Sequence, residues 1–197
     1  MRSCFILAAL IACPATGLAE DLPALFDVTG VARGDVLNIR AQPSARAPVV
    51  DTLPPDARGI EVVAQIGAWG AVNTGEGTGY ASMTYLKPAP GPGWASLEVP
   101  LRCVGTEPFW GLDYAPEDQV LTLSLPDEGE REMPVTATWP ALPWSPLVGL
   151  GMAEGTAVLR PEECSDGMSD RTFGLALDLF LTGAAPMHFA GCCSLTD

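Results

Sequence analysis

The clearest pattern of hydrophobic and polar positions in this chain runs through residues 35–44, DVLNIRAQPS. Leu37, Ile39 and Ala41 alternate with three polar residues, which gives an extended backbone one apolar and one polar face. Pro43 ends the run because proline brings no amide hydrogen to a β ladder. The pattern therefore predicts a β-strand with one face in a core and the other toward solvent.

Further short β-prone runs flank this strand and are separated by turn residues. They cover residues 26–31, 59–66, 69–73 and the return from the glycine-rich hairpin 74–79. Residues 88–93, PAPGPG, form a proline- and glycine-rich linker that we expect to stay outside any core. This linker divides the chain into an N-terminal unit, residues 26–87, and a second unit, residues 94–197.

The second unit repeats the same kind of short run and shows no long apolar stripe at helical spacing. The runs are 109–114, 120–125, 135–139, 156–159, 173–181 and 187–190. Residues 173–181 could form a helix, but Gly174 and its β-prone neighbours favour a strand. We therefore predict an all-β protein whose second unit is a small β-barrel or a curled β-sheet.

The N-terminal unit carries an ordered series of short motifs. They are Leu37-Asn38-Ile39-Arg40-Ala41 with Pro43-Ser44, Leu53 with its proline turn, Trp69-Gly70, Gly79-Tyr80-Ala81 and Tyr85-Leu86. In this order they resemble the bacterial SH3 (SH3b) domain over residues 26–87, although that family often has Trp where Tyr80 stands. The resemblance implies a small β-barrel that works on the envelope side of a bacterium.

Three motifs in the second unit also belong together. They are CVGTEPFW at 103–110, CSDGMSDR at 164–171 and GCC at 191–193. The combination resembles a family of bacterial envelope domains without an assigned activity, whose common form has Asn at the position of Thr106. This resemblance implies a disulfide-tied envelope domain.

Residues 1–19 have the composition of an export signal. Arg2 supplies a positive start, an apolar stretch follows, and Gly17-Leu18-Ala19 forms a small-residue cleavage site. The apolar stretch is too short for a permanent anchor, so we predict no stable membrane span and a periplasmic or secreted protein. The alternative is a lipoprotein anchored at Cys13, because the sequence Leu10-Ile11-Ala12-Cys13 resembles a lipobox motif.

Acidic residues dominate the charge. The chain has 24 acidic and 10 basic residues, a formal net charge of −14, and loss of Arg2 with the signal would leave −15. The sequence lacks the clusters of Lys and Arg that bind phosphate groups. We therefore predict no nucleic-acid partner and no binding to anionic lipid, and we assign most of the acidity to solubility.

Four cysteines remain after signal cleavage: Cys103, Cys164, Cys192 and Cys193. An even number in an exported chain predicts two disulfides formed in an oxidising compartment. Because neighbours on a strand point to opposite faces, we expect Cys103 and Cys164 each to pair with one of the adjacent two. A strained, redox-labile bond between the adjacent cysteines is one alternative, and zinc is another, although His188 is the only histidine. We predict no metal and no cofactor.

Five residues of the N-terminal unit could bind a ligand. They are Asn38, Arg40, Trp69, Tyr80 and Tyr85. The three aromatic rings could line a shallow groove for an extended peptide or glycan, whereas in so small a barrel such rings also fill the core. Arg40 could hold a carboxylate with its guanidinium group, but a structural bond to Asp35 is the simpler expectation.

Carboxylates of the second unit suggest two further sites. Asp166 and Asp170 lie in a glycine-containing loop just after the acidic residues 162–163, so their oxygens could bind calcium. The spacing does not match a calcium-binding EF-hand loop, and Arg171 offers Asp170 a partner, so we expect a turn held by aspartate side chains. Glu107 could act as a general acid, but bonds to local backbone amides are the simpler expectation.

The residues required for catalysis are incomplete. A cysteine peptidase needs a Cys beside a His with an orienting group, and His188 lies close in sequence to cysteines expected to form disulfides. The sequence has no Gly-x-Ser-x-Gly elbow, His-rich metal site or phosphate loop. Paired carboxylates for glycan hydrolysis stay open, because their separation is set in space. We predict that the protein is not an enzyme.

Together these observations favour a non-enzymatic binding protein of the bacterial cell envelope. Its SH3b-like unit would recognise peptidoglycan or another extended peptide, and the second unit would add a surface or a rigid support. One alternative is a cell-wall hydrolase or hydrolase inhibitor acting through the C-terminal unit. Another is a structural factor that binds a second envelope protein.

Overall fold

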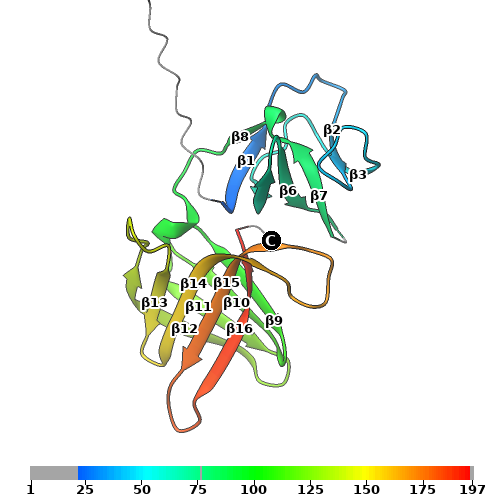
Figure 1. Ribbon diagram of the computed structural model, residues 1–197. Helices are drawn as coiled ribbons and strands as arrows, with labels where there is room; N and C mark the ends of the chain where they lie inside the picture. Colours follow the sequence, from blue (N-terminus) through cyan, green and yellow to red (C-terminus); the bar gives the residue numbers. More distant parts are fainter. Residues whose placement is uncertain (1–21, 76, 196–197) are drawn as a thin grey trace, which may run out of the picture.

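The computed structural model describes residues 22–75 and 77–195. The predicted export signal and the alternative anchor at Cys13 lie outside these residues. Two β-sheet bodies make up the described structure, a smaller N-terminal unit and a larger barrel below it in Figure 1. Among the described residues, no helix is long and apolar enough to cross a bilayer.

The N-terminal unit consists of two antiparallel sheets with the strand orders β4-β1-β8 and β3-β2-β7-β6-β5. The strands are β1 (Ala24–Val28), β2 (Leu37–Arg40), β3 (Val49–Leu53), β4 (Ile60–Val62), β5 (Ala64–Ile66), β6 (Trp69–Asn73), β7 (Thr78–Ser82) and β8 (Leu86–Pro88), with the short helix η1 (Met83–Tyr85) before β8. Inward side chains of both sheets form one hydrophobic core. Leu37 and Ile39 belong to that core, as the alternation predicts. The prediction is wrong for Ala41, which is exposed because β2 ends at Arg40.

Two predicted strands of this unit have different limits in the structure. The first strand spans Ala24–Val28 and does not continue to Val31, because Gly30 takes a positive φ of 75° and turns the chain. The predicted strand 59–66 is wrong as a single element. It breaks at Val63, so that β4 pairs with β1 in one sheet and β5 pairs with β6 in the other.

The second unit is a closed, eight-stranded antiparallel barrel with the order β10-β11-β12-β13-β14-β15-β16-β9. After the short helix η2 (Trp94–Ser96), its strands are β9 (Leu101–Thr106), β10 (Phe109–Ala115), β11 (Val120–Leu125), β12 (Gly129–Trp139), β13 (Val148–Met152), β14 (Gly155–Cys164), β15 (Phe173–Leu181) and β16 (Met187–Ser194). The barrel closes where β9 pairs with both β10 and β16. The predicted all-β fold is confirmed, and residues 173–181 form a strand.

Two barrel strands, β9 and β13, were not predicted from the hydrophobic pattern. All five residues of β13 are buried, and two of them are glycines, so this strand has no polar face to produce an alternation. The opposite problem affects β12, whose first half is almost entirely exposed and polar. Only its later part, from Val135, was predicted.

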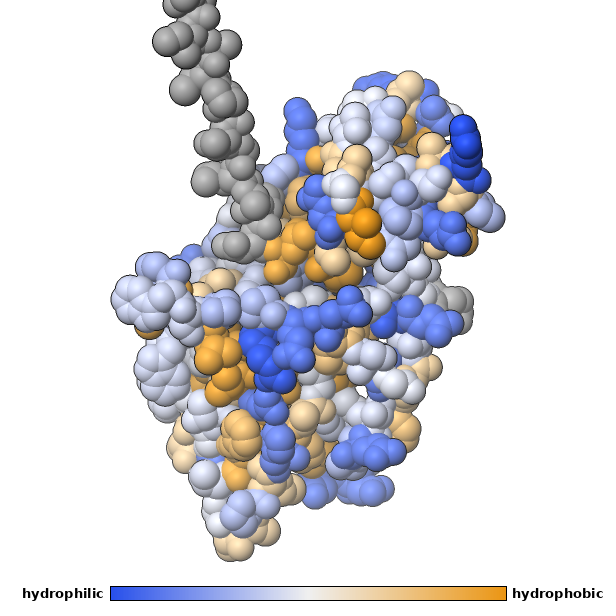
Figure 2. All heavy atoms as spheres, viewed as in Figure 1, coloured by the Kyte–Doolittle hydropathy of each residue, from blue (hydrophilic) through white to orange (hydrophobic). Residues whose placement is uncertain are grey.

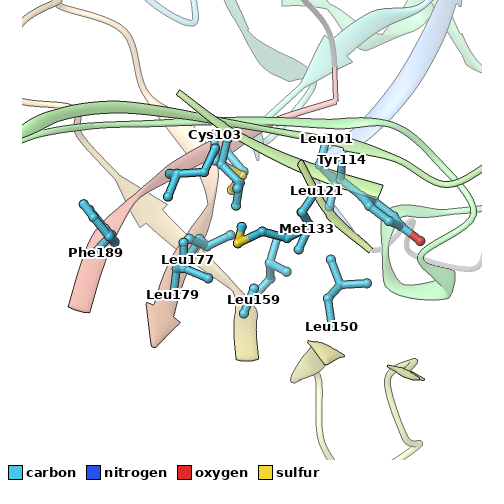
Figure 3. Packing of buried hydrophobic residues seen from close by; sticks show 14 of the residues in the cluster. Leu101, Cys103, Tyr114, Leu121, Met133, Leu150, Leu159, Leu177, Leu179 and Phe189 are labelled. Carbon is cyan, nitrogen blue, oxygen red and sulfur yellow. A yellow bond between two sulfur atoms is a disulfide. The ribbon is translucent and has the colours of Figure 1, made fainter. Parts of the chain in front are cut away.

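The barrel core is built around leucine side chains that point inward from most strands, together with aromatic residues (Figure 3). Trp110 is its tightest fit. A Cβ on Gly105 would lie 2.2 Å from the indole nitrogen, and a Cβ on Gly191 would lie 2.6 Å from the indole ring. The ring of Phe189 meets the Trp110 ring edge-on, with the ring centroids 5.8 Å apart. The two glycines therefore leave the space that the indole occupies.

Two disulfides tie the barrel, as the cysteine count predicts. Cys103 and Cys193 are register partners on β9 and β16, and both are buried in the core. Cys164 bonds Cys192, which joins β14 to β16 across the intervening β15. The adjacent cysteines thus bond to separate partners, and neither the zinc site nor the bond between neighbours forms.

We expect Gly191→Ala to destabilise the barrel strongly. The added Cβ would lie 2.1 Å from the backbone oxygen of Val104 as well as against Trp110, so backbone must move. The expected loss is about 3 kcal/mol in the free energy of unfolding, the upper range for overpacking. Urea unfolding followed by tryptophan fluorescence measures it. Gly111→Ala is the matched control, because its Cβ would meet only Ser124 at 3.9 Å. Equal stability of the two variants would contradict the packing role of Gly191.

Candidate functional site

The outward face of the five-stranded sheet gathers four of the five predicted ligand-binding residues. Along β2, β6 and β7, alternate residues face the core and the intervening ones face away from it. The outward positions include Asn38, Arg40, Trp69 and Tyr80. Arg40 and Tyr80 are direct register partners on neighbouring strands. We call this surface the outer face.

The two aromatic side chains of the outer face are half-buried. Neither Trp69 nor Tyr80 belongs to the hydrophobic core of the unit, so the alternative that these rings fill the core is wrong. Ala71 pairs with Tyr80 and follows Trp69 by two positions, so it lies on the same face beside both residues, and it is itself buried. The exposed parts of the two rings therefore make this surface partly apolar.

Arg40 does not make its expected bond to Asp35. Its Nη1 donates a hydrogen bond to the carbonyl oxygen of Ala47 at 2.8 Å, while Asp35 accepts one from the amide of Val36. The bond to Ala47 holds the loop between β2 and β3 against the sheet. The guanidinium group has five N–H donors and uses one of them in this bond, which leaves others for a ligand.

Tyr85 lies apart from the outer face. It belongs to η1, after the end of β7, and its side chain is 40% exposed. Its ring lies beside Gly30 in the turn after β1, and its carbonyl oxygen accepts a hydrogen bond from the amide of Thr29. The structure therefore brings together four of the predicted residues and separates the fifth.

A cleft between the two units was not predicted. Its volume is about 530 Å³, and its lining residues are Asp51, Glu61, Asn73, Thr74, Gly75, Arg102, Val104, Asp166, Met168, Arg171, Phe173 and Ser194. Asn73 is an outward position of β6, so the cleft begins where the outer face ends. The lining residues come from distant parts of the chain, and only the charged motif at 164–171 pointed to one wall.

Hydrogen bonds across this junction fix one unit against the other. The side-chain Nδ2 of Asn73 donates a hydrogen bond to the carbonyl oxygen of Thr172 at 2.9 Å. The backbone amide of Thr172 donates one to the hydroxyl of Thr78 at 2.8 Å. Gly77 forms an isolated bridge with Asp170, and the amide of Thr78 donates to the carbonyl oxygen of Asp170. The barrel loop 165–172 thus docks on the β6–β7 hairpin.

Aspartate side chains hold this barrel loop, as expected. The Asp166 carboxylate accepts hydrogen bonds from the amides of Met168 and Ser169 and from the Ser169 hydroxyl. Burial, the largest single influence, would raise the pKa of Asp166, but these bonds and the charge of Arg171 outweigh it and lower the pKa. Arg171 donates to the carbonyl oxygen of Gly75 in the other unit, so the structure does not pair it with Asp170 as predicted.

The carboxylates that line the cleft are engaged by backbone amides. Asp51 accepts a hydrogen bond from the amide of Thr52 at 2.7 Å, and the buried Glu61 accepts one from Leu195 at 3.2 Å. Glu107 lies elsewhere, exposed on the β9–β10 turn, and within the described residues no backbone amide donates to it. The described residues also hold no group of three or more His, Cys, Asp or Glu side chains suited to a metal ion.

His188 belongs to a charged cluster on the outside of the barrel. Its Nε2 lies 2.8 Å from the carboxylate of Asp178, which also bonds Arg160, and its ring stacks on Phe180. Burial would raise the pKa of Asp178, but the bonds with Arg160 and His188 outweigh it and lower the pKa. Hydrophilic side chains form a band over β14 and β15 in Figure 2. All four described cysteines are in disulfides, so none is a free thiol beside His188.

Comparisons of the chain with protein-family models, curated proteins and solved structures find no match. The resemblances stated from the sequence therefore stay predictions. The structure adds a geometric result to them. The three motifs of the second unit lie close together, because Gly105 and Gly191 enclose Trp110 and the Cys164–Cys192 bond anchors the loop 165–172.

We expect Asn73→Ala to loosen the junction between the units. The variant removes the Asn73 Nδ2 that donates to the Thr172 carbonyl oxygen. It also removes the Asn73 Oδ1 that accepts a hydrogen bond from the backbone amide of Thr172. The amides of Thr78 and Thr172 should exchange with solvent about five-fold faster, which corresponds to about 1 kcal/mol for one hydrogen bond. Hydrogen exchange measured by NMR gives the rates. Gln65→Ala is the control, because Gln65 bonds only Gly67 within its own unit. Unchanged exchange in Asn73→Ala would contradict the docking role of Asn73.

The lowered pKa of Asp166 predicts a specific loss of stability in acid. Its contribution to the free energy of unfolding is complete above the ordinary value of 3.8 and is lost as the pH falls through the lower folded-state pKa. In Asp166→Asn the charge is absent at every pH. The wild type should therefore exceed the variant by about 1 kcal/mol near pH 6, and the difference should vanish near pH 2. Urea unfolding across this pH range tests it, and a constant difference would refute it.

Proposed function

We propose that this protein is an exported, non-enzymatic binding protein of the bacterial cell envelope. Its N-terminal unit is an SH3b-like module that recognises peptidoglycan or another extended peptide on the outer face. The observation that carries the proposal is that Asn38, Arg40, Trp69 and Tyr80 share one partly exposed face outside the core.

The chemistry of the outer face suits an extended peptide with a carboxylate. Flat rings bind such ligands at little cost in conformational entropy, and Trp69 and Tyr80 flank the small Ala71. Arg40 lies beside Tyr80 and keeps guanidinium donors for a carboxylate, as in a peptidoglycan stem peptide. Asn38, two positions earlier on β2, supplies an amide donor and acceptor for a peptide backbone.

The barrel serves as the rigid support in this proposal. The docked loop 165–172 fixes the end of the β6–β7 hairpin, and therefore the strands that carry Trp69 and Tyr80. An extended ligand that follows the outer face toward Asn73 reaches the cleft between the units. Two disulfides also support export, because such bonds form and persist in oxidising compartments.

Sedimentation with purified peptidoglycan tests the proposal. The full chain should pellet with the polymer, and Trp69→Ala and Tyr80→Ala should each weaken binding by about ten-fold, as for an aromatic hot spot. Tyr85→Ala is the matched control, because Tyr85 is an exposed aromatic of the same unit that lies off the outer face. It should bind within about two-fold of the wild type.

Other outcomes would replace this proposal with a different function. Equal binding by all three variants would exclude the outer face as the site. A fall in the turbidity of a murein suspension would indicate a hydrolase, and protection of murein from added lysozyme would indicate a hydrolase inhibitor. Absence of binding both to peptidoglycan and to its isolated stem peptides would favour a factor that binds another envelope protein.

A further inference from the structure

A groove crosses the outside of the barrel, away from the outer face. Its volume is about 450 Å³, and it runs over β9, β10, β11 and the start of β12. The direct register partners Val104, Gly111 and Ser124 form its floor. Gly111 has no side chain, and a Cβ there would meet only Ser124 at 3.9 Å, so the floor is open at this point. Phe109 and Met168 stand beside it.

A second hollow of about 290 Å³ continues past Phe109, between the β9–β10 turn, the β11–β12 turn and the start of β16. Phe109, Leu125 and Pro126 line both hollows, so they form one surface, which we call the Phe109 groove. Phe109 is 55% exposed although it is a large apolar side chain. Met187 adds an exposed, flexible side chain to the second hollow.

The walls of the Phe109 groove are apolar and adaptable. Met168 is 60% exposed and lines the groove from the loop 165–172. Methionine has an unbranched, polarizable side chain and is common on surfaces that accept more than one binding sequence. Exposed aromatic and methionine side chains gathered in hollows are typical of protein interaction sites.

Carboxylates surround these apolar walls. Glu130 lines the first hollow, and Asp127 and Glu128 line the second. Glu107 is exposed on the turn before Phe109. Four basic groups lie nearby. Arg131 contacts the sulfur of Met133, and His188 bonds Asp178. Arg102 and Arg171 line the neighbouring cleft between the units, which shares Val104 and Met168 with the groove, and Arg171 donates a hydrogen bond to the carbonyl oxygen of Gly75. The second unit as a whole contains 16 acidic residues and four arginines.

We propose that the Phe109 groove binds an extended, basic segment of a partner protein. An apolar side chain of that segment packs against Phe109, Met168 or Met187, and flanking Lys or Arg side chains lie against the carboxylates of the β11–β12 turn. The charge of the rim selects this partner, because acidic rims attract and orient cationic ligands. This site shares no residue with the outer face and does not depend on the function proposed for it.

The same charges disfavour other occupants. Nucleic acid and anionic lipid are repelled by an acidic rim. A second copy of this chain would bring two acidic rims together in a protein with a net charge of −14. A neutral glycan would gain nothing from the carboxylates that flank Phe109.

Fluorescence anisotropy of a short labelled peptide tests the proposal with the full chain. The probe alternates Lys with Leu and Phe, and its counterpart carries Glu in place of each Lys. The basic probe should bind and the acidic one should not. Binding should weaken at least ten-fold as NaCl rises toward about 1 M, where the Debye length falls to about 3 Å.

Variants locate the binding on the barrel. Phe109→Ala should weaken binding by about ten-fold, because it removes the central aromatic anchor. Glu128→Gln with Glu130→Gln should weaken it about five-fold. Both sets change exposed side chains, and urea unfolding checks that each variant keeps the stability of the wild type. Peptidoglycan binding through the outer face should not change in any of them.

Two controls separate the groove from general charge and hydrophobicity. Glu117→Gln with Asp118→Asn removes the same charge from the β10–β11 turn, at the opposite end of the barrel, and should leave affinity within two-fold. Trp144→Ala removes an aromatic that is 81% exposed outside the groove and should have no effect. Equal weakening by either control, binding of the acidic probe, or no binding of the basic one would overturn the proposal. Dimerisation in sedimentation velocity that Phe109→Ala abolishes would also overturn it.

Discussion

Closure of the barrel between β9 and β16 is the contact on which the rest of the structure depends. These strands start and complete the barrel, and Cys103 and Cys193 face each other across them inside the core. Closure also brings Gly105 and Gly191 together around Trp110. The contact joins residues 90 positions apart, so it costs considerable loop entropy, which a disulfide and a filled core offset.

The second disulfide anchors the barrel loop that contacts the other unit. The Cys164–Cys192 bond fixes the base of the loop 165–172, and Asp166 holds its turn. The loop then pairs with the β6–β7 hairpin and so restricts the sheet that carries the outer face. The N-terminal core is small, and the docked loop gives the β6–β7 hairpin an additional support.

How much the sequence predicts depends on how local each feature is. Alternation at Leu37 and Ile39 is local and correctly assigns a core-facing strand. The strand β13 is buried along its whole length, so the same method misses it. Arg40 bonds the Ala47 carbonyl and not Asp35, because the path of the following loop decides its partner. A hydrogen bond at the junction between the units joins Asn73 to Thr172, 99 positions apart, and the hydrophobic periodicity of the sequence cannot predict such a contact.

The position of β16 has a consequence for how the molecule reaches its final form. A chain synthesised from its N-terminus contains every strand of the small two-sheet unit before the barrel is complete. The barrel can neither close nor form either disulfide before β16 is present, because that strand supplies Cys192, Cys193 and the second pairing partner of β9. Until then β9 and β15 each present a bare edge, which other chains could pair with. The folding chain is thus open to pairing with other chains until β16 has joined the barrel and both disulfides have formed.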